Sequence, residues 1–284
     1  FMNFMNFMNF MNFMNFMNSV NSMNSMNSVN SMNYKLSTLL LFLFSLQLLW
    51  GQTEKSFPHY TWINPVASYD VGARFGYEKA SFTLINKNCR NLPVSDPCHD
   101  GDEYCDLTLL GRYKNGSMTE HVNILFTPGP SVDPLFSITD KNNNLIWAEA
   151  AEEMCINSNG IIYLSGNMNK MFNQRMKLRF AGGKVTEVKQ PFYYVDVKGK
   201  LLKPVKLYSE KGNRGELVAT LPVGYEIEVL LADPETGTDE YGYQKPMMNY
   251  LARTAFGLVG WLRLTEEDNF HMDPVVRGLG FLGD

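Results

Sequence analysis

The stretch VATLPVGYEIEVLLAD, residues 218–233, carries the clearest fold signal in the chain. Between Tyr225 and Val229 apolar residues alternate with two glutamates, a period of two that predicts a strand with one buried face and one wet face. Pro222 and Gly224 stand just before this alternation, where they predict a turn. The stretch therefore predicts a strand entered through a tight turn.

A closing hairpin follows in NYLARTAFGLVGWLRL, residues 249–264, with its tip expected at 255–257. Side chains on a strand alternate between its two faces. Three leucines, at positions 258, 262 and 264, share one parity with Gly260, and we expect them to face the core. Trp261 has the other parity and is expected on the opposite, partly exposed face, where a large aromatic side chain is more informative than in a core.

These strands belong to an ordered set of motifs. V-x-L-Y at 205–208 comes first, followed by a turn rich in glycine and charge, the block V-A-T-L-P-x-G-Y-E-I-E-V at 218–229, and G-W-L at 260–262. This order resembles the bacterial Src-homology-3 (SH3) type of small β-barrel. The resemblance implies a barrel over residues 201–268, a C-terminal tail over 269–284, and a binding role in which Tyr208 lies in a groove.

The preceding residues, 55–200, predict a separate all-β domain that is antiparallel and meander-like or sandwich-like. Short runs with strand character alternate with Gly/Asn turn signals, and AGGK between MKLRF and VTEVK predicts a hairpin. AEAAEEM has good helix formers but is short and flanked by strand-like residues, so it predicts a strand end plus a turn. We expect the domain boundary near 198–200, after PFYYVDV as the last strand of the first domain. The predicted fold class is all-β.

The sequence before residue 32 has neither the periodicity of a helix nor that of a strand. Residues 1–31 belong to a run of eleven triplets that ends at Asn33, each closed by asparagine, and a period of three matches neither helix nor strand. We expect an over-extended reading frame there, with an Asn-rich, aggregation-prone tail as the alternative. Residues 32–51 combine Lys35 with a short apolar run and predict a secretory signal peptide cleaved after Gly51. The run is too short for a membrane anchor, so we expect a soluble periplasmic or extracellular protein.

The chain has four cysteines, an even number that predicts two disulfides in an exported protein. Three pairings are possible, and we favour Cys98–Cys105 and Cys89–Cys155. Zinc is the alternative, but Cys98 and His99 are adjacent rather than spaced as a ligand pair.

The expected ligand-binding site combines the barrel with a long connection. Residues 233–249 would form a 17-residue loop if they joined two ordinary hairpin strands. Tyr208 and Trp261 could line one groove, to which the loop would add two more aromatic and two acidic side chains: Tyr241, Tyr243, Asp239 and Glu240. An aromatic groove with an acidic rim suits peptides that carry proline or a basic group.

Catalytic motifs are missing from the sequence, which has no nucleophile elbow, P-loop or dinucleotide-binding turn. Because bacterial SH3 domains often accompany cysteine peptidases, we considered Cys155 with His121 or His271, but Cys155 precedes a turn and a strand rather than a helix. The acidic residues near Cys98 do not have the spacing of a calcium loop and predict a solvated loop; they are Asp96, Asp100, Asp102, Glu103 and Asp106.

The sequence thus predicts a non-catalytic binding protein of the bacterial cell envelope, with no cofactor and no metal. Its partner would be a peptide, a peptidoglycan fragment or an envelope protein. A formal net charge of −4 gives no basic surface for nucleic acid. The alternatives are an envelope hydrolase with an unrecognised site in the first domain, and inhibitor or immunity-type roles.

Overall fold

The structure is a computed structural model that describes residues 52–67, 70–90, 106–129, 133–238, 244–265 and 273–282. Residues Phe57–Asp284 form one compact unit, and the short helix α3 (Gln52–Ser56) belongs to the unit before it. The triplet repeat at 1–31 and the signal peptide at 32–51 lie outside the described residues, so both stay predictions. Within the described ranges, no helix has the length and apolar character needed to cross a membrane.

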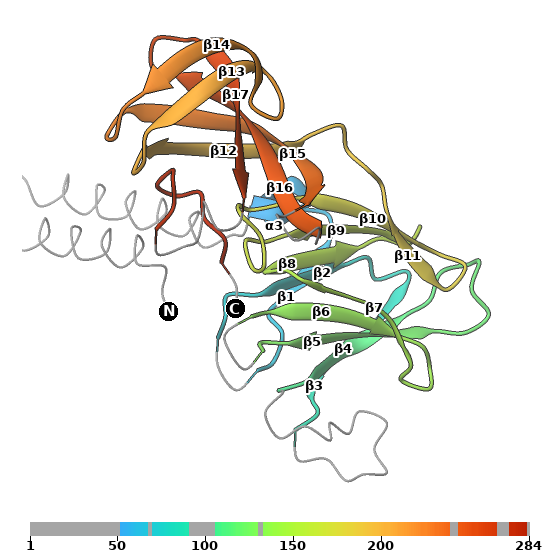
Figure 1. The fold of residues 1–284 in the computed structure, drawn as a ribbon. Coiled ribbons are helices and arrows are strands. Elements are labelled where there is room, and N and C mark those ends of the chain that lie inside the picture. The colour runs from blue at the N-terminus through green and yellow to red at the C-terminus, as the bar shows by residue number, and fades with distance from the viewer. Residues whose placement is uncertain are drawn as a thin grey trace, which may run out of the picture. The chain divides into compact units, whose positions relative to one another are not determined.

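The all-β prediction is confirmed, because α3 is the only helix among the described residues and strands β1–β17 build three sheets (Figure 1). The strands of the first two sheets are β1 (Thr61–Ile63), β2 (Arg74–Tyr77), β3 (Phe82–Asn88), β4 (Thr108–Tyr113), β5 (Val122–Thr127), β6 (Leu135–Thr139), β7 (Leu145–Ala150), β8 (Glu153–Ile156), β9 (Ile161–Ser165), β10 (Met176–Ala181) and β11 (Lys184–Glu187). The strands of the third sheet are β12 (Tyr193–Lys200), β13 (Val205–Glu210), β14 (Arg214–Leu221), β15 (Glu226–Thr238), β16 (Gln244–Thr254) and β17 (Val259–Thr265).

The first two sheets enclose one core. One sheet has the order β1-β2-β8-β9-β10-β11, and the other is the meander β3-β4-β5-β6-β7. Both supply fully buried side chains to the same cluster, for example Phe75 from the first sheet and Phe136 from the second. This shared core is what the alternating strands of the first domain predict for two stacked sheets.

Turn chemistry explains how consecutive strands connect. Gly182 and Gly183 join β10 to β11, and both have positive φ values, 58° and 72°, which the favoured two-residue hairpin turn requires. The AEAAEEM segment is likewise a strand end and a turn, since β7 ends at Ala150 and β8 begins at Glu153. The sequence did not predict β1 and β2, nor the parallel pairing of β2 with β8.

The third sheet has the order β12-β15-β16-β17-β13-β14 and encloses a second core. Strands β15, β16 and β17 form an antiparallel meander, which is the element order expected from residues 226–265. Strand β13 closes on β17 at a single residue pair, Tyr208 and Trp261. The two most strongly predicted segments are therefore neighbours in one sheet.

The expected barrel bounds, 201–268, do not coincide with the third sheet and its core. β12, which we expected to end the first domain, pairs with β15 and contributes Tyr193 and Val195 to the second core. The expected tail also contributes, because Val276 and Leu279 are fully buried in that core. A boundary at residue 201 would therefore cut through a sheet, and a boundary at 268 would remove core residues.

The prediction of a 17-residue loop at 233–249 is also wrong. Most of this segment is paired strand, because β15 and β16 stay in register from Asp233 opposite Asn249 to Thr238 opposite Gln244. The acidic and polar composition of this segment did not indicate strands, although its backbone groups pair with each other as a hairpin. Only the tip of this hairpin, residues 239–243, lies outside the described residues.

The favoured disulfide Cys89–Cys155 is wrong. Cys155 is a free, buried thiol, whereas Cys89 is disulfide-bonded. The other favoured pairing, Cys98–Cys105, lies outside the described residues, as does the partner of Cys89. The prediction of two disulfides within the chain is also wrong, because a free Cys155 leaves only three of the four cysteines to pair.

Candidate binding face of the third sheet

The outer face of the third sheet presents the two aromatic residues singled out in the sequence. Leu262 and Leu264 are buried, and Trp261, directly before Leu262, is half-buried on the opposite face, as parity predicted. Tyr208 is half-buried and lies directly opposite Trp261 on the neighbouring strand. The expectation for Leu258 is wrong, because this residue precedes β17 and is 42% exposed.

Strand register extends this pair into a continuous row across all six strands. Each member faces the next through backbone pairing: Tyr194, Leu231, Leu251, Trp261, Tyr208 and Leu217. We call these six residues the apolar row. Its ends are open to solvent, with Tyr194 53% and Leu217 55% exposed, and its middle is half-buried.

A lysine lies against the aromatic middle of the apolar row. The Nζ atom of Lys211 is 5.1 Å from the ring centroid of Trp261 and 4.7 Å from that of Phe192. The two rings are 6.1 Å apart, and the same ammonium group forms an ion pair with Asp233. We call Phe192, Trp261 and Asp233 the cage, because they surround one positive charge with two π faces and a carboxylate.

The turn that carries Lys211 is fixed through other groups. The backbone N–H of Gly212 donates to Asn249 Oδ1 at 2.8 Å, and Asn249 Nδ2 donates to Glu235 at 2.8 Å. Asn249 is only 1% exposed, whereas its two partners are partly open to water. The backbone N–H of Arg263 also donates to Asn213 Oδ1 at 3.1 Å. Residues 211–213 are thus tied to β16 and β17 by their backbone and by Asn213.

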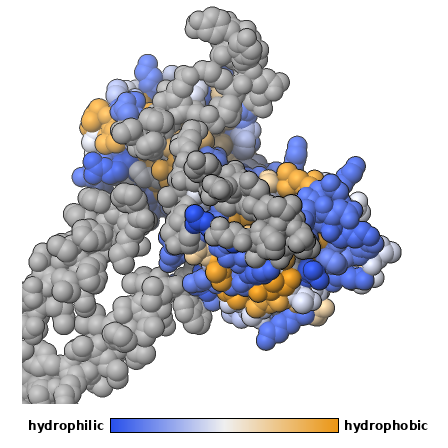
Figure 2. All heavy atoms as spheres, turned by 90° about the horizontal axis from the view of Figure 1, so that it is seen from below, coloured by the Kyte–Doolittle hydropathy of each residue, from blue (hydrophilic) through white to orange (hydrophobic). Residues whose placement is uncertain are grey.

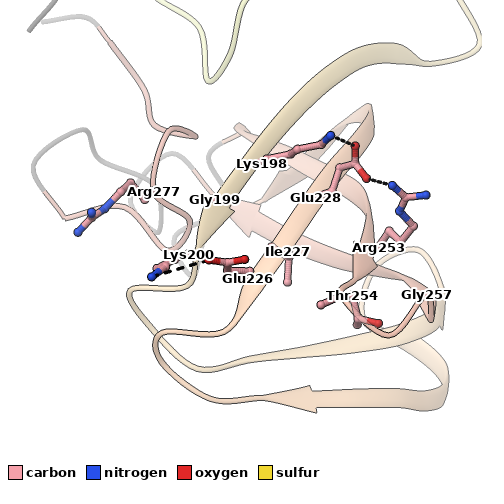
Figure 3. A pocket seen from close by; sticks show the side chains of 11 residues that line it. Lys198, Gly199, Lys200, Glu226, Ile227, Glu228, Arg253, Thr254, Gly257 and Arg277 are labelled. Carbon is pink, nitrogen blue, oxygen red and sulfur yellow. Dashed lines mark hydrogen bonds and ion pairs between the residues drawn. The ribbon is translucent and has the colours of Figure 1, made fainter. Parts of the chain in front are cut away.

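On the other flank of the apolar row lies a pocket of about 600 Å³ with charged walls (Figure 3). Glu228 binds Lys198 at 3.3 Å and also pairs with Arg253, while Lys200 lies 3.8 Å from Glu226. Partial burial tends to raise the pKa of Glu228, but the hydrogen bonds from Arg253 and Lys198 outweigh it and lower this pKa. Most of the charges in this pocket therefore already neutralise one another.

Only part of the predicted site can be placed. Tyr208 and Trp261 come together as expected, and Tyr208 also lines a pocket of about 440 Å³ beside Lys206 and Thr220. Four predicted members of the groove lie outside the described residues: Asp239, Glu240, Tyr241 and Tyr243. The sequence missed Phe192, Lys211 and Asp233, and no local pattern indicates that these three meet.

Cys155 does not have the properties of a catalytic nucleophile. It is completely buried on β8, and desolvation raises the pKa of its thiol well above the usual value. A reactive cysteine needs the opposite, a lowered pKa and some access to solvent. Of its two suggested partners, His121 lies just before β5 and His271 lies outside the described residues.

The acidic cluster near Cys98 can be followed only at Asp106, which is buried and accepts a hydrogen bond from Asn88 at 2.7 Å. Asp96, Asp100, Asp102 and Glu103 lie outside the described residues. In the part of the chain that the structure describes, no three His, Cys, Asp or Glu side chains gather closely enough to hold a metal ion.

Figure 2 shows that hydrophilic side chains cover much of the described surface on the side it presents, with hydrophobic side chains in separate patches among them.

Comparison with known proteins found no matching family model, no matching curated protein and no matching solved structure.

Proposed function

We propose that this chain is an exported, non-catalytic binding protein of the bacterial cell envelope. Its SH3-like C-terminal sheet would recognise a peptide, a peptidoglycan fragment or an envelope protein. The observation that carries the proposal is the apolar row, a line of six apolar side chains on the solvent side of the sheet. Side chains on that face are not required for the core, which lies on the other side.

The dimensions of the apolar row suit an extended ligand. Neighbouring strands are about 4.8 Å apart, so six strands carry the row over roughly 24 Å along the sheet. An extended peptide rises about 3.3 Å per residue, and about seven residues would cover that distance. Aromatic residues such as Trp261 and Tyr208 are the types that most often carry binding energy in the centre of an interface.

The flanks of the apolar row also resemble a binding surface more than a core. Interfaces combine an apolar centre with a polar rim. Here the ion pairs around Glu228 lie on one side of the row, and the ion pair of Lys211 with Asp233 lies on the other. The cysteine-peptidase possibility finds less support, because Cys155 is buried and burial raises the pKa of its thiol. The hydrolase alternative has an unrecognised site in the first domain, and the digestion assay below tests it.

Binding to isolated envelope fractions tests the proposal. Trp261→Ala and Tyr208→Ala should each weaken binding by about 1 kcal/mol or more, the usual threshold for interface residues that matter. Phe256→Ala is the matched control, because Phe256 is an 85% exposed aromatic in the turn between β16 and β17, outside the apolar row. All three variants must first show the thermal transition of the unchanged protein.

Unchanged binding by both folded row variants would move the function to the first two sheets. A muropeptide digestion assay, run beside the binding assay, separates binding from hydrolysis. Digestion by the purified chain would favour the hydrolase and overturn the proposal.

A further inference from the structure

The contacts of Lys211 are those of a bound ligand rather than those of a structural lysine. Its ammonium group is 4.7 Å and 5.1 Å from two ring centroids and also meets a carboxylate. Rings and a carboxylate together are how proteins recognise alkylammonium groups. The cage is thus a site for a positive charge, which the chain fills with its own side chain.

The fold does not depend on the Lys211 side chain staying in place. The turn is held by the bond from Gly212 N–H to Asn249 and by the bond from Arg263 N–H to Asn213. The side chains of Lys211 and Asp233 are 37% and 28% exposed, so water can replace their ion pair. Partly exposed ion pairs of this kind contribute little to stability. The side chain can therefore leave while its backbone stays fixed.

We propose that the cage recognises the ammonium group of a lysine side chain on a partner peptide, and that Lys211 occupies it as an internal competitor in the free protein. This inference rests on the proposed function, because the cage shares Trp261 with the apolar row. A peptide lying along the row would place a lysine in the cage and apolar side chains on Leu251 and Leu231. Binding would replace Lys211 in the cage by the lysine of the peptide. This competition lowers the affinity of the cage for any lysine side chain, and it therefore favours peptides that also contact the apolar row.

A small probe tests the cage separately from any natural ligand. The probe is Nα-acetyl-lysine N-methylamide, titrated into the full chain while the indole N–H signal of Trp261 is followed by NMR. Trp261→Phe identifies that signal. Three variants are compared with the unchanged protein: Lys211→Met, which keeps the length of the side chain but not its charge; Lys184→Met, the control at an exposed hairpin lysine of another sheet; and Lys211→Met combined with Asp233→Asn.

We expect Lys211→Met to bind the probe about tenfold more tightly than the unchanged protein, a difference of about 1.4 kcal/mol. Lys184→Met should bind like the unchanged protein, and adding Asp233→Asn should remove the gain. Equal affinity of Lys211→Met and the unchanged protein would overturn the proposal. A gain that survives Asp233→Asn would overturn it as well.

A second measurement on the unchanged protein covers the case in which Lys211→Met does not fold. At high probe concentration the side-chain signals of Lys211 must move together with the Trp261 indole signal, because one ammonium displaces the other. A Trp261 signal that moves while those of Lys211 stay in place excludes competition.

The two proposals can fail separately. If Lys211→Met gains affinity for the probe but Trp261→Ala leaves envelope binding unchanged, the cage stands and the proposed function falls. If Trp261→Ala abolishes envelope binding but the probe does not distinguish Lys211→Met, the proposed function stands and the inference about the cage falls.

Discussion

At the residue scale, the face of Trp261 was predictable and its neighbours in the cage were not. The alternation around 258–264 correctly placed Trp261 opposite Leu262. Phe192 precedes β12 and Lys211 follows β13, so their contacts with Trp261 depend on how distant strands fold together. A periodicity within one strand tells which face a residue takes, but not which residues of other strands lie beside it.

The first prediction concerns Cys155, whose burial and raised pKa leave almost no thiolate at neutral pH. We expect iodoacetamide to leave Cys155 unmodified in the native protein and to alkylate it once guanidinium has unfolded the chain, as measured by peptide mapping. Cys155→Ala should bind the envelope like the unchanged protein. Rapid alkylation of native Cys155, or loss of function in Cys155→Ala, would restore the catalytic reading.

At the element scale, hairpins with clear turn residues were predictable and the long β15–β16 hairpin was not. AGGK marked the β10–β11 turn because glycine adopts the two positive φ angles that the turn needs. The segment 233–249 contains Pro234 and Pro246 and few apolar residues, so its pattern favoured a loop. Its pairing arises instead because β15 and β16 continue as one ladder from the core.

The second prediction tests how this hairpin holds the turn beneath the cage. Asn249→Ala removes the acceptor of the Gly212 N–H group in a site that is 1% exposed. Gly212 is half-buried, so losing this hydrogen bond costs about 0.5–1.5 kcal/mol, and we expect that loss in the free energy of unfolding. Asn142→Ala, at an exposed turn position, is the control and should change stability by less than about 0.5 kcal/mol. Equal effects of the two substitutions would mean that Asn249 does not organise the turn.

The third prediction concerns how Glu78, which is bonded to the turn between β8 and β9, affects the stability of the fold at low pH. Glu78 accepts hydrogen bonds from the backbone N–H and the hydroxyl of Ser158, at 2.8 Å and 2.5 Å, and these lower its pKa from the ordinary value of 4.5. Because the folded pKa is lowered, the stabilisation is complete above the unfolded pKa and is lost as pH falls through the folded pKa. Glu78 is only half-buried, so water screens its bonds and the contribution is small, about 0.2–1 kcal/mol.

Denaturant titrations between neutral pH and about pH 3 measure this contribution. Glu78→Gln should be less stable than the unchanged protein at neutral pH, and the difference should shrink as the pH falls. Glu216→Gln, at an exposed position of β14, should show a constant difference. A difference for Glu78→Gln that grows on acidification would contradict the account.

At the scale of the whole molecule, the fold class was predictable, whereas the limits of the third sheet and its core were not. The strand-like runs and turns gave an all-β chain, but they could not show that β12 leaves the first domain to pair with β15. The same limit applies to Val276 and Leu279, which belong to a segment without strand character yet fill the second core. Such contributions are decided by where the chain runs in space.

The fourth prediction tests which residues the third sheet and its core need in order to fold. A fragment of residues 201–268 lacks Tyr193 and Val195 on one side, and Val275, Val276 and Leu279 on the other. Each buried apolar side chain contributes about 1.5–3 kcal/mol, so this fragment should not unfold cooperatively. A fragment of residues 188–284 restores all five and should show a cooperative thermal transition. The account is wrong if both fragments unfold cooperatively with the same midpoint.

The central claim is that the outer face of the third sheet binds the partner. Hydrogen–deuterium exchange of the full chain, with and without solubilised envelope fraction, tests it most directly. The account predicts slower exchange in peptides that cover β13, β16 and β17, around Tyr208, Leu251 and Trp261, and unchanged exchange in β3–β7. Protection concentrated in β3–β7, or none anywhere, would contradict it.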